Sequence, residues 1–379
     1  MTRIVFASFC LLSLFTLSCS RVPKRVVIGI ALTRSNHPAA QLALDEINAR
    51  GGVNGIPMAA MGLDWKVARD FGSEEILKWA EDFARNEDLV AVVGHSDSTA
   101  TLSAAAFYNQ HQIPQLVTIA TNPAITNIGD WTYRLCISDL TQGKALARYA
   151  VKDWGKKSIC IFYVNDAYGK GLAEILQREV RDLGAKVVAN RMHRNELQDQ
   201  DKETITATLA ELKRTGAPDL FVLIQRIVAA NWTIAAIRKA GFNSSILGAD
   251  NLAQPEFLRR NAELCEGIRV SQFYLPSPDD SAAMKFLNSF RQANGSEPDY
   301  GQAFAYDAVY LVRDAVARFG FSRSAVKKYL DYLITEQVAV HGVGGDYLLG
   351  PDHDARRGMY IAEARNGRYE RVMQINPGE

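Results

Sequence analysis

Hydroxyl side chains follow two apolar stretches of the chain, at residues 92–99 (VVGHSDST) and 116–122 (LVTIATN). Each stretch predicts a buried strand that ends in a polar turn and leads into a helix. Because an open parallel sheet binds ligands at the carboxyl ends of its strands, both turns are expected to face a ligand. The free N–H groups and positive dipole end of a helix start favour an anion, and hydroxyls add further donors. The two turns therefore predict a small-molecule site that suits a carboxylate.

The composition is that of a globular protein with a sizeable core. The chain has 379 residues, 47% of them hydrophobic, and Lys plus Arg number 43 against 42 for Asp plus Glu. This length favours two domains. The near balance of charge leaves no basic field for nucleic acid, so no nucleic-acid partner is expected.

The first residues have the pattern of an export signal. Arg3 supplies a positive charge, residues 4–17 are apolar and uncharged, and residues 16–19 read TLSC. The apolar stretch is shorter than the roughly 20 residues that span a bilayer, which favours a secretory leader over a membrane helix. TLSC resembles a bacterial lipobox, with residues 1–18 as signal peptide and Cys19 as the acylated residue. Because Thr16 stands where Leu is usual, cleavage near Ser20 is the alternative.

This leader indicates where the mature chain resides. We expect an exported protein, periplasmic or at the cell surface, that touches a bacterial membrane only through a lipid anchor. Beyond the leader, Cys136, Cys160 and Cys265 remain, an odd number at unrelated spacings that predicts no disulfide framework. Cys160 lies within a predicted buried strand, so we expect a buried free thiol there.

Strands and helices alternate along the mature chain. A strand is predicted over residues 25–31 and a helix over 38–49. Further short β-rich runs occupy residues 63–67, 91–93, 115–117, 158–164, 185–188, 220–223 and 245–247. Helical stretches separate these runs, which is the pattern of parallel α/β units. The fold class predicted is therefore α/β, with parallel sheets covered by helices on both faces.

The alternation occurs once before residue 138 and again after residue 155, which suggests two similar lobes. No Pro-rich or Gly/Ser-rich linker separates them, which favours extended strands as the connections. Residues 133–137 (YRLCI) and 268–273 (IRVSQF) are the candidates. If both cross, the segment after residue 272 returns to the first lobe.

Six segments in order carry a resemblance to a known family: residues 28–30, 45–55 (DEINARGGVNG), 120–123 (ATNP), 165–172 (NDAYGKGL), 240–242 (AGF) and 306–309 (YDAV). Together they resemble the type I periplasmic binding proteins of the leucine/isoleucine/valine-binding branch. This resemblance implies two three-layer lobes joined by three hinge crossovers, residues 25–137 plus 272–344 and residues 138–271 plus 345–379. It also implies an amino acid or similar carboxylate bound in a closing cleft and delivery to an ABC permease. The sequence has no catalytic or cofactor-binding motif, so neither an enzyme nor a cofactor is expected.

The resemblance places the ligand's α-carboxylate on the first lobe. Ser98, the backbone around Ile119, and Thr121 match the family positions that receive it. Hydroxyls and N–H groups can stabilise an anion without a full positive charge. The alternative is that Ser98 and Thr121 only cap their own helices. Asp97 is left outside the predicted site, because it would repel a carboxylate.

On the second lobe, two further residues match family positions and a third departs from the family pattern. Tyr168 matches a tyrosine that closes over the ligand, and Asp250 matches the acid that pairs with the ammonium group. Their alternatives are a core aromatic under the following turn and a helix cap. Arg226 stands where the family often has an aromatic residue and would favour a polar or acidic side chain, unless it is solvated at the rim.

Two other functions remain open at this stage. A ligand-sensing lipoprotein that reports to a receptor or envelope enzyme would show the same motifs. A hydrolase would need a nucleophile, and residues 94–98 (GHSDS) lack the second glycine of a nucleophile elbow. The six histidines are scattered, and residues 352–354 (DHD) suit a polar turn better than a metal site, so no metal is expected.

Overall fold

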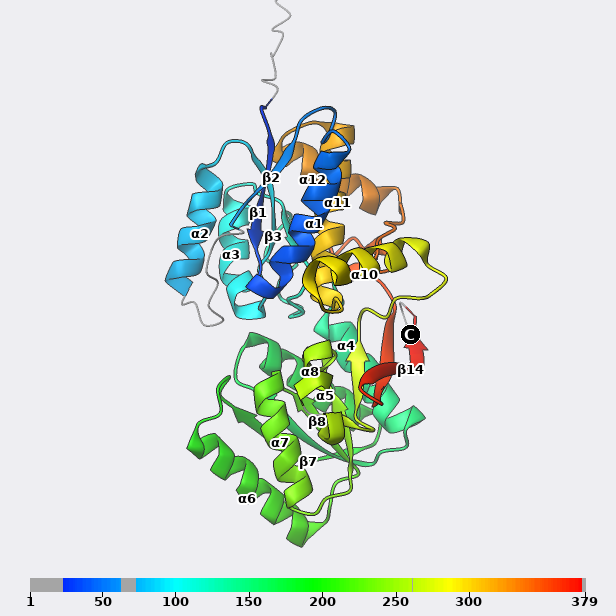
Figure 1. The fold of residues 1–379 in the computed structure, drawn as a ribbon. Helices are drawn as coiled ribbons and strands as arrows, with labels where there is room; N and C mark the ends of the chain where they lie inside the picture. The colour runs from blue at the N-terminus through cyan, green and yellow to red at the C-terminus, as the bar shows by residue number, and fades with distance from the viewer. Residues whose placement is uncertain (1–22, 63–72, 261, 377–379) are drawn as a thin grey trace, which may run out of the picture.

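The computed structural model describes residues 23–62, 73–260 and 262–376, which form two α/β lobes arranged end to end (Figure 1). The predicted leader, Cys19 and the expected strand at 63–67 lie outside these residues. Among the described helices, none has the length and apolar character needed to cross a bilayer.

The first lobe is built on a five-stranded parallel sheet in the order β2-β1-β3-β4-β5. Its strands are β1 (Val26–Ala31), β2 (Met58–Met61), β3 (Leu89–Gly94), β4 (Gln115–Val117) and β5 (Thr132–Arg134). Every residue of β1 and β3 is buried, as expected of parallel strands covered on both faces.

Helices cover both faces of this sheet. One core joins it to α1 (His37–Ala49), α11 (Tyr300–Phe319) and α12 (Arg323–Thr335), with α10 (Ser281–Asn294) beside α1. A second core joins it to α2 (Ser73–Arg85) and α3 (Ser98–Gln110). Ile28 and Ile30 face the first core and Val27 the second, because side chains alternate along a strand.

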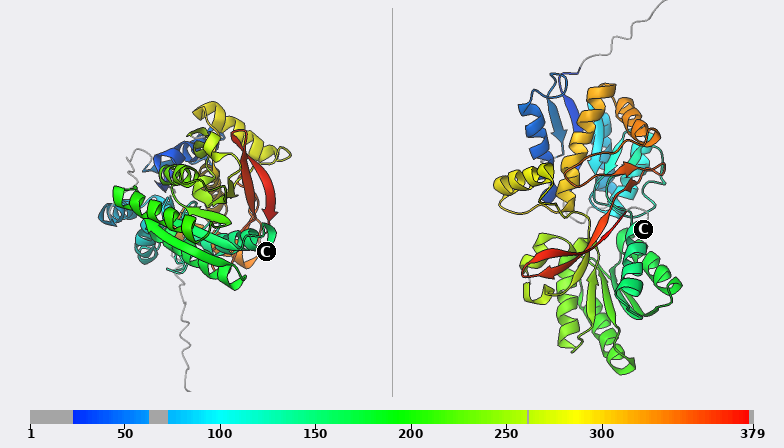
Figure 2. Two further views of the ribbon diagram at one scale, coloured as in Figure 1. Left: turned by 90° about the horizontal axis from the view of Figure 1, so that it is seen from below. Right: turned by 90° about the vertical axis from the view of Figure 1, so that its right-hand side faces the viewer.

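The second lobe has a seven-stranded sheet in the order β14-β13-β10-β9-β8-β6-β7. Five strands are parallel: β6 (Ser158–Val164), β7 (Lys186–His193), β8 (Leu220–Ile224), β9 (Ser245–Gly248) and β10 (Arg269–Gln272). The hairpin of β13 (Met359–Arg365) and β14 (Arg368–Ile375) adds two antiparallel strands at one edge (Figure 2). The sequence predicts parallel strands only, so this hairpin is a correction.

Two helical layers enclose this sheet. One contains α4 (Asp139–Arg148), the π-helical turn η2 (Tyr149–Asp153) and α5 (Ala167–Asp182). The other contains α6 (Asp199–Thr215), α7 (Ile227–Lys239) and the short α8 (Pro255–Arg260) and α9 (Ala262–Cys265). Cys136, Cys160 and Cys265 are buried free thiols, as predicted for Cys160.

The chain passes between the lobes three times: after β5, after β10, and before β13. The third passage lies later than the sequence predicts. Instead of changing lobe at residue 345, the chain first forms β11 (Leu348–Leu349) and β12 (Ala355–Arg356), and β11 packs on α12 of the first lobe. The Arg134 amide donates to the His353 carbonyl at 2.9 Å, which holds this hairpin against β5. Residues 345–356 therefore belong with the first lobe.

Candidate functional site

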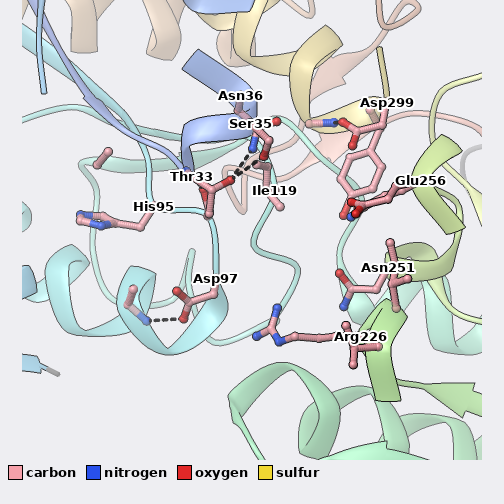
Figure 3. A pocket seen from close by; sticks show the side chains of 18 of the residues that line it. Thr33, Ser35, Asn36, His95, Asp97, Ile119, Arg226, Asn251, Glu256 and Asp299 are labelled. Carbon is pink, nitrogen blue, oxygen red and sulfur yellow. Dashed lines mark hydrogen bonds between the residues drawn. The ribbon is translucent and has the colours of Figure 1, made fainter. Parts of the chain in front are cut away.

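Two adjacent cavities lie between the lobes. The smaller, of about 20 Å³, is called the proximal cage; Ser98, Ile119, Thr121, Tyr168, Arg226 and Asp250 all line it. The larger, of about 160 Å³, is called the distal chamber; Ile119 and Arg226 line it as well (Figure 3). Every residue that the sequence singles out for the ligand thus faces one space, to which both lobes contribute.

The first-lobe wall of the cage is formed by the start of α3 and the loop after β4. Asp97 is the N-cap of α3, because its Oδ1 accepts from the Ala100 amide at 2.8 Å. Ser98 is the first helical residue and does not cap the helix; its Oγ accepts from the Asn122 amide at 3.3 Å. No helix begins after Thr121, since turns lead directly to β5, which corrects the expected helix there.

Arg134 shapes this loop from behind and was missed by the sequence analysis. Its fully buried guanidinium donates through Nη1 to the carbonyls of Thr121 at 2.9 Å and Asn122 at 2.6 Å. It also pairs with both oxygens of Asp354, so residues 352–354 serve a structural ion pair rather than a metal. An arginine inside the apolar segment YRLCI was the available signal, because buried arginines are rare unless paired.

Asp250 is the centre of a buried hydrogen-bond cluster. Its Oδ1 accepts from Tyr168 Oη at 2.7 Å and Gln142 Nε2 at 2.9 Å, and its Oδ2 accepts from Tyr300 Oη at 2.8 Å. No side-chain cap bond accompanies it at the start of η3 (Asp250–Leu252), so the helix-cap alternative does not describe its contacts. Tyr300 belongs to the first lobe, and its hydroxyl therefore joins the two walls.

The environment keeps these donors protonated. Burial, followed by the charge of Asp250, raises the pKa of both Tyr168 and Tyr300 well above its usual value. Burial and the Asp250 charge likewise raise the pKa of Asp139, which favours its neutral form. The structure thus concentrates proton donors around Asp250.

Gln142 and Tyr300, which donate to Asp250, were not predicted from the sequence, because neither follows a strand end and each lies far from Asp250 in sequence.

Arg226 and Asp97 stand at the boundary between the two cavities. Arg226 Nη2 contacts Asp166 Oδ2 at 2.9 Å, and its side chain is 29% exposed, so it enters the cleft and is not a fully solvated rim residue. Asp97 lines both cavities, although it was expected to lie outside the site. Its place as N-cap between Ser96 and Ser98 puts it on the wall, and burial raises its pKa.

The segment 94–98 does not form a hydrolytic pair. His95 Nε2 lies 3.1 Å from Tyr108 Oη, and Ser96 Oγ accepts from the Thr33 amide at 2.7 Å. Burial lowers the pKa of His95 to about 4. The described residues contain no group of three or more His, Cys, Asp and Glu side chains placed to hold a metal ion.

Two lobes around a polar cavity suit a solute-binding protein, and similar proteins are of this class. Residues 31–368 match the periplasmic binding protein family, and the chain belongs to this family. It is a binding protein and not an enzyme. The family resemblance seen in the sequence is confirmed.

Individual relatives support the same assignment. The Leu/Ile/Val-binding protein homolog 1 of Brucella abortus is 26% identical over 314 residues, 78% of each chain. An amino acid binding protein of Pseudomonas aeruginosa is 29% identical over 298 residues, 75% of this chain and 76% of the relative.

Solved structures show the same fold. The Streptococcus pneumoniae branched-chain amino acid transporter substrate binding protein LivJ, in complex with isoleucine, has a TM-score of 0.81 at 24% identity and covers 93% of this chain and 100% of its own. A Rhodopseudomonas palustris solute binding protein in complex with benzoate has a TM-score of 0.78 at 17% identity, covering 93% and 97%. The two-lobed α/β fold predicted from the sequence is confirmed.

Proposed function

We propose that this chain is the extracytoplasmic solute-binding component of an ABC importer, and that it binds an amino acid or a related small carboxylate that carries an ammonium group. The observation that carries the proposal is the proximal cage, which is lined by Ser98 and Thr121 of the first lobe and by the buried carboxylate of Asp250 of the second. The similar proteins support the same ligand class, because they are named as Leu/Ile/Val-binding, amino acid binding and branched-chain amino acid transporter proteins.

Each wall of the cage has a separate task. Ser98, Thr121 and the backbone at Ile119 donate to the ligand's carboxylate. Asp250 accepts from the ammonium group: an ionised carboxylate offers about four acceptor positions, and three are already used. Tyr168 closes the second-lobe side, where its ring excludes water and its hydroxyl holds Asp250 in place.

Closure between the lobes completes the cage. The ligand first contacts the wall with Ser98 and Thr121, and rotation about the three passages brings up Tyr168, Asp250 and Arg226. Two hydrogen bonds across the cleft would hold the lobes in the closed arrangement: Tyr300 Oη to Asp250, and Asn122 Nδ2 to the Ala167 carbonyl at 2.6 Å. The closed shape is what the permease recognises.

The N-terminal residues give the protein its location. Removal of residues 1–18 and acylation of Cys19 anchor the chain to a bacterial membrane, with both lobes outside the cytoplasm. Mass spectrometry of the mature protein tests this step: a diacyl or triacyl mass on Cys19 is expected, and an unmodified N-terminus near Ser20 contradicts it.

The binding proposal is tested by isothermal titration calorimetry of the exported chain carrying Cys19→Ser. Glycine and larger L-amino acids are compared with acetate and methylamine, which each lack one of the two recognised groups. Asp250→Asn is expected to weaken amino acid binding by at least about 2 kcal/mol, roughly 30-fold, because it removes the charge that meets the ammonium group.

Asp199→Asn is the matched control, since the Asp199 side chain is 95% exposed on α6. Its affinities are expected to equal those of the parent. Acetate binding as tightly as glycine, or Asp250→Asn binding like the control, contradicts the ammonium assignment.

A further inference from the structure

The distal chamber extends the cage toward the position of a ligand side chain, and its wall has mixed character. Ile76 and Trp79 of α2 and Ile119 supply apolar surface. Asp97 stands where the chamber meets the cage, and Glu256 lines the chamber as well (Figure 3). A side chain that leaves the cage therefore passes apolar surface and ends among polar groups.

The chamber's cation, Arg226, already has a partner. Its Nη2 lies 2.9 Å from Asp166, which belongs to the same lobe. Asp166 is itself fixed as the N-cap of α5, where its Oδ1 accepts from the Gly169 amide at 2.8 Å. The positive charge of Arg226 is thus largely balanced before any ligand arrives, and it offers little to an anionic side chain.

Asp97 is in the opposite situation. Its carboxylate is tied to the α3 N-terminus through the Ala100 amide, and it has acceptor positions left over. Burial raises its pKa and the charge of Asp166 adds to this; the Ala100 amide, the charge of Arg226 and the Thr99 amide oppose the shift without cancelling it, so the ionised form lacks full compensation. A positive group beside Asp97 supplies that compensation.

We propose that Asp97 selects the ligand's side chain, and that the distal chamber takes a side chain ending in a positively charged amine or guanidinium. This inference rests on the proposed function, because it concerns the far end of the same ligand. It reverses the expectation that Arg226 favours an acidic side chain. An acidic group would lie near Asp97 and Glu256, while Arg226 is paired with Asp166.

Calorimetry on the exported chain carrying Cys19→Ser tests the order of affinities, with glycine, L-leucine, L-lysine and L-glutamate as probes at pH 7. L-lysine is expected to bind roughly tenfold or more tightly than L-leucine, and L-glutamate weakest of the three larger probes. The preference for L-lysine is expected to shrink in high salt, since salt screens charge pairs.

Two matched variants locate the preference. Asp97→Asn keeps the cap of α3, because Asn and Asp cap equally well, and removes only the charge. It is expected to lower the ratio of L-lysine to glycine affinity roughly tenfold. Asp166→Asn keeps the cap of α5 and releases Arg226; it is expected to raise L-glutamate affinity relative to L-lysine. Asp199→Asn, far from the cleft, is expected to change neither ratio.

The possible outcomes distinguish a failure of this inference from a failure of the proposed function. If no amino acid binds, glycine included, the proposed function fails and the inference fails with it. If glycine and L-leucine bind but L-lysine has no advantage, or if Asp97→Asn leaves the L-lysine ratio intact, the inference alone is overturned and the amino acid binding function stands.

Discussion

Arg134 forms a two-point ion pair with Asp354, although 220 positions separate them in the sequence: Nε lies 2.9 Å from Oδ1 and Nη2 lies 2.6 Å from Oδ2. The same guanidinium holds the Thr121 and Asn122 carbonyls, so the pair ties the cage loop to the hairpin before the third passage. Because Arg134 is fully buried, its charge depends on protein partners such as Asp354 for compensation.

Asp354→Ala is therefore expected to destabilise the protein strongly. Loss of one partner leaves a buried charge, and the free energy of unfolding should fall by about 3–5 kcal/mol. Urea denaturation measures it. The control is Asp352→Asn in the same hairpin, whose pair with Arg356 is half exposed and contributes less than about 1 kcal/mol. An equal loss of unfolding free energy in the two variants would show that the buried ion pair stabilises the protein no more than the exposed pair does.

The sequence predicts most of the parallel strands because such strands are continuous apolar runs. Residues 115–117 and 158–164 match β4 and β6 to the residue. The β13–β14 hairpin has no such run. Its outer strand is exposed or half-buried at every residue except Ile375 and carries Arg368, Glu370 and Arg371, so the sequence there resembles a polar surface segment. Its place in the second sheet depends on pairing with β10, which no local pattern reveals.

The predicted site residues share one sequence property: most follow a strand end. That signal finds Ser98, Thr121 and Asp250, because strand ends converge in an open sheet. It does not find Gln142 or Tyr300, which come from helices and reach Asp250 only after the lobes pack. Long-range hydrogen bonds of this kind depend on the whole fold, and a single sequence does not encode them as a local pattern.

Gly171 provides a test of closure. A Cβ at Gly171 would lie 2.9 Å from Asn122 Nδ2, which already donates to the Ala167 carbonyl across the cleft. Gly171→Ala is expected to stabilise α5 by about 1 kcal/mol and to weaken ligand binding, because the methyl group crowds the closed contact. Calorimetry measures the affinity and urea denaturation the stability.

A double-mutant cycle gives the control for this contact. In an Asn122→Ala background the crowding is relieved, so Gly171→Ala should no longer weaken binding. Additive effects of the two substitutions on affinity would contradict the proposed interference between them.

Because of His95, the free energy of unfolding is expected to fall at acid pH. Burial lowers its pKa from 6.5 to about 4, so between these values the unfolded state binds a proton that the folded state does not. The contribution of His95 to stability is therefore complete above pH 6.5 and falls by about 3 kcal/mol as the pH drops to 4. His95→Gln removes this pH-dependent contribution. Urea denaturation at a series of pH values should therefore show that the free energy of unfolding falls less steeply below pH 6.5 in the variant than in the parent.

Asp307 acts in the opposite direction and serves as the comparison. Burial raises its pKa from 3.8 to about 6, so the folded state holds the proton more tightly and its contribution falls as the pH rises from 4 to 6. Asp307→Asn is expected to make the protein relatively more sensitive to acid. If both variants shift the pH profile in the same direction, one of the two assignments is contradicted.

The Tyr168 and Tyr300 hydroxyls, which donate to Asp250, are expected to stabilise the folded protein. Tyr168→Phe and Tyr300→Phe each remove a hydroxyl that donates to a buried carboxylate, and each is expected to lower the free energy of unfolding by about 1.5–3 kcal/mol. Tyr310→Phe is the control: its hydroxyl donates to Glu46 at 2.7 Å, but both residues are partly exposed, so water replaces the lost bond. Urea denaturation of the ligand-free protein compares the three. A loss for Tyr310→Phe as large as for the other two would mean that burial of Asp250 does not set the strength of these bonds.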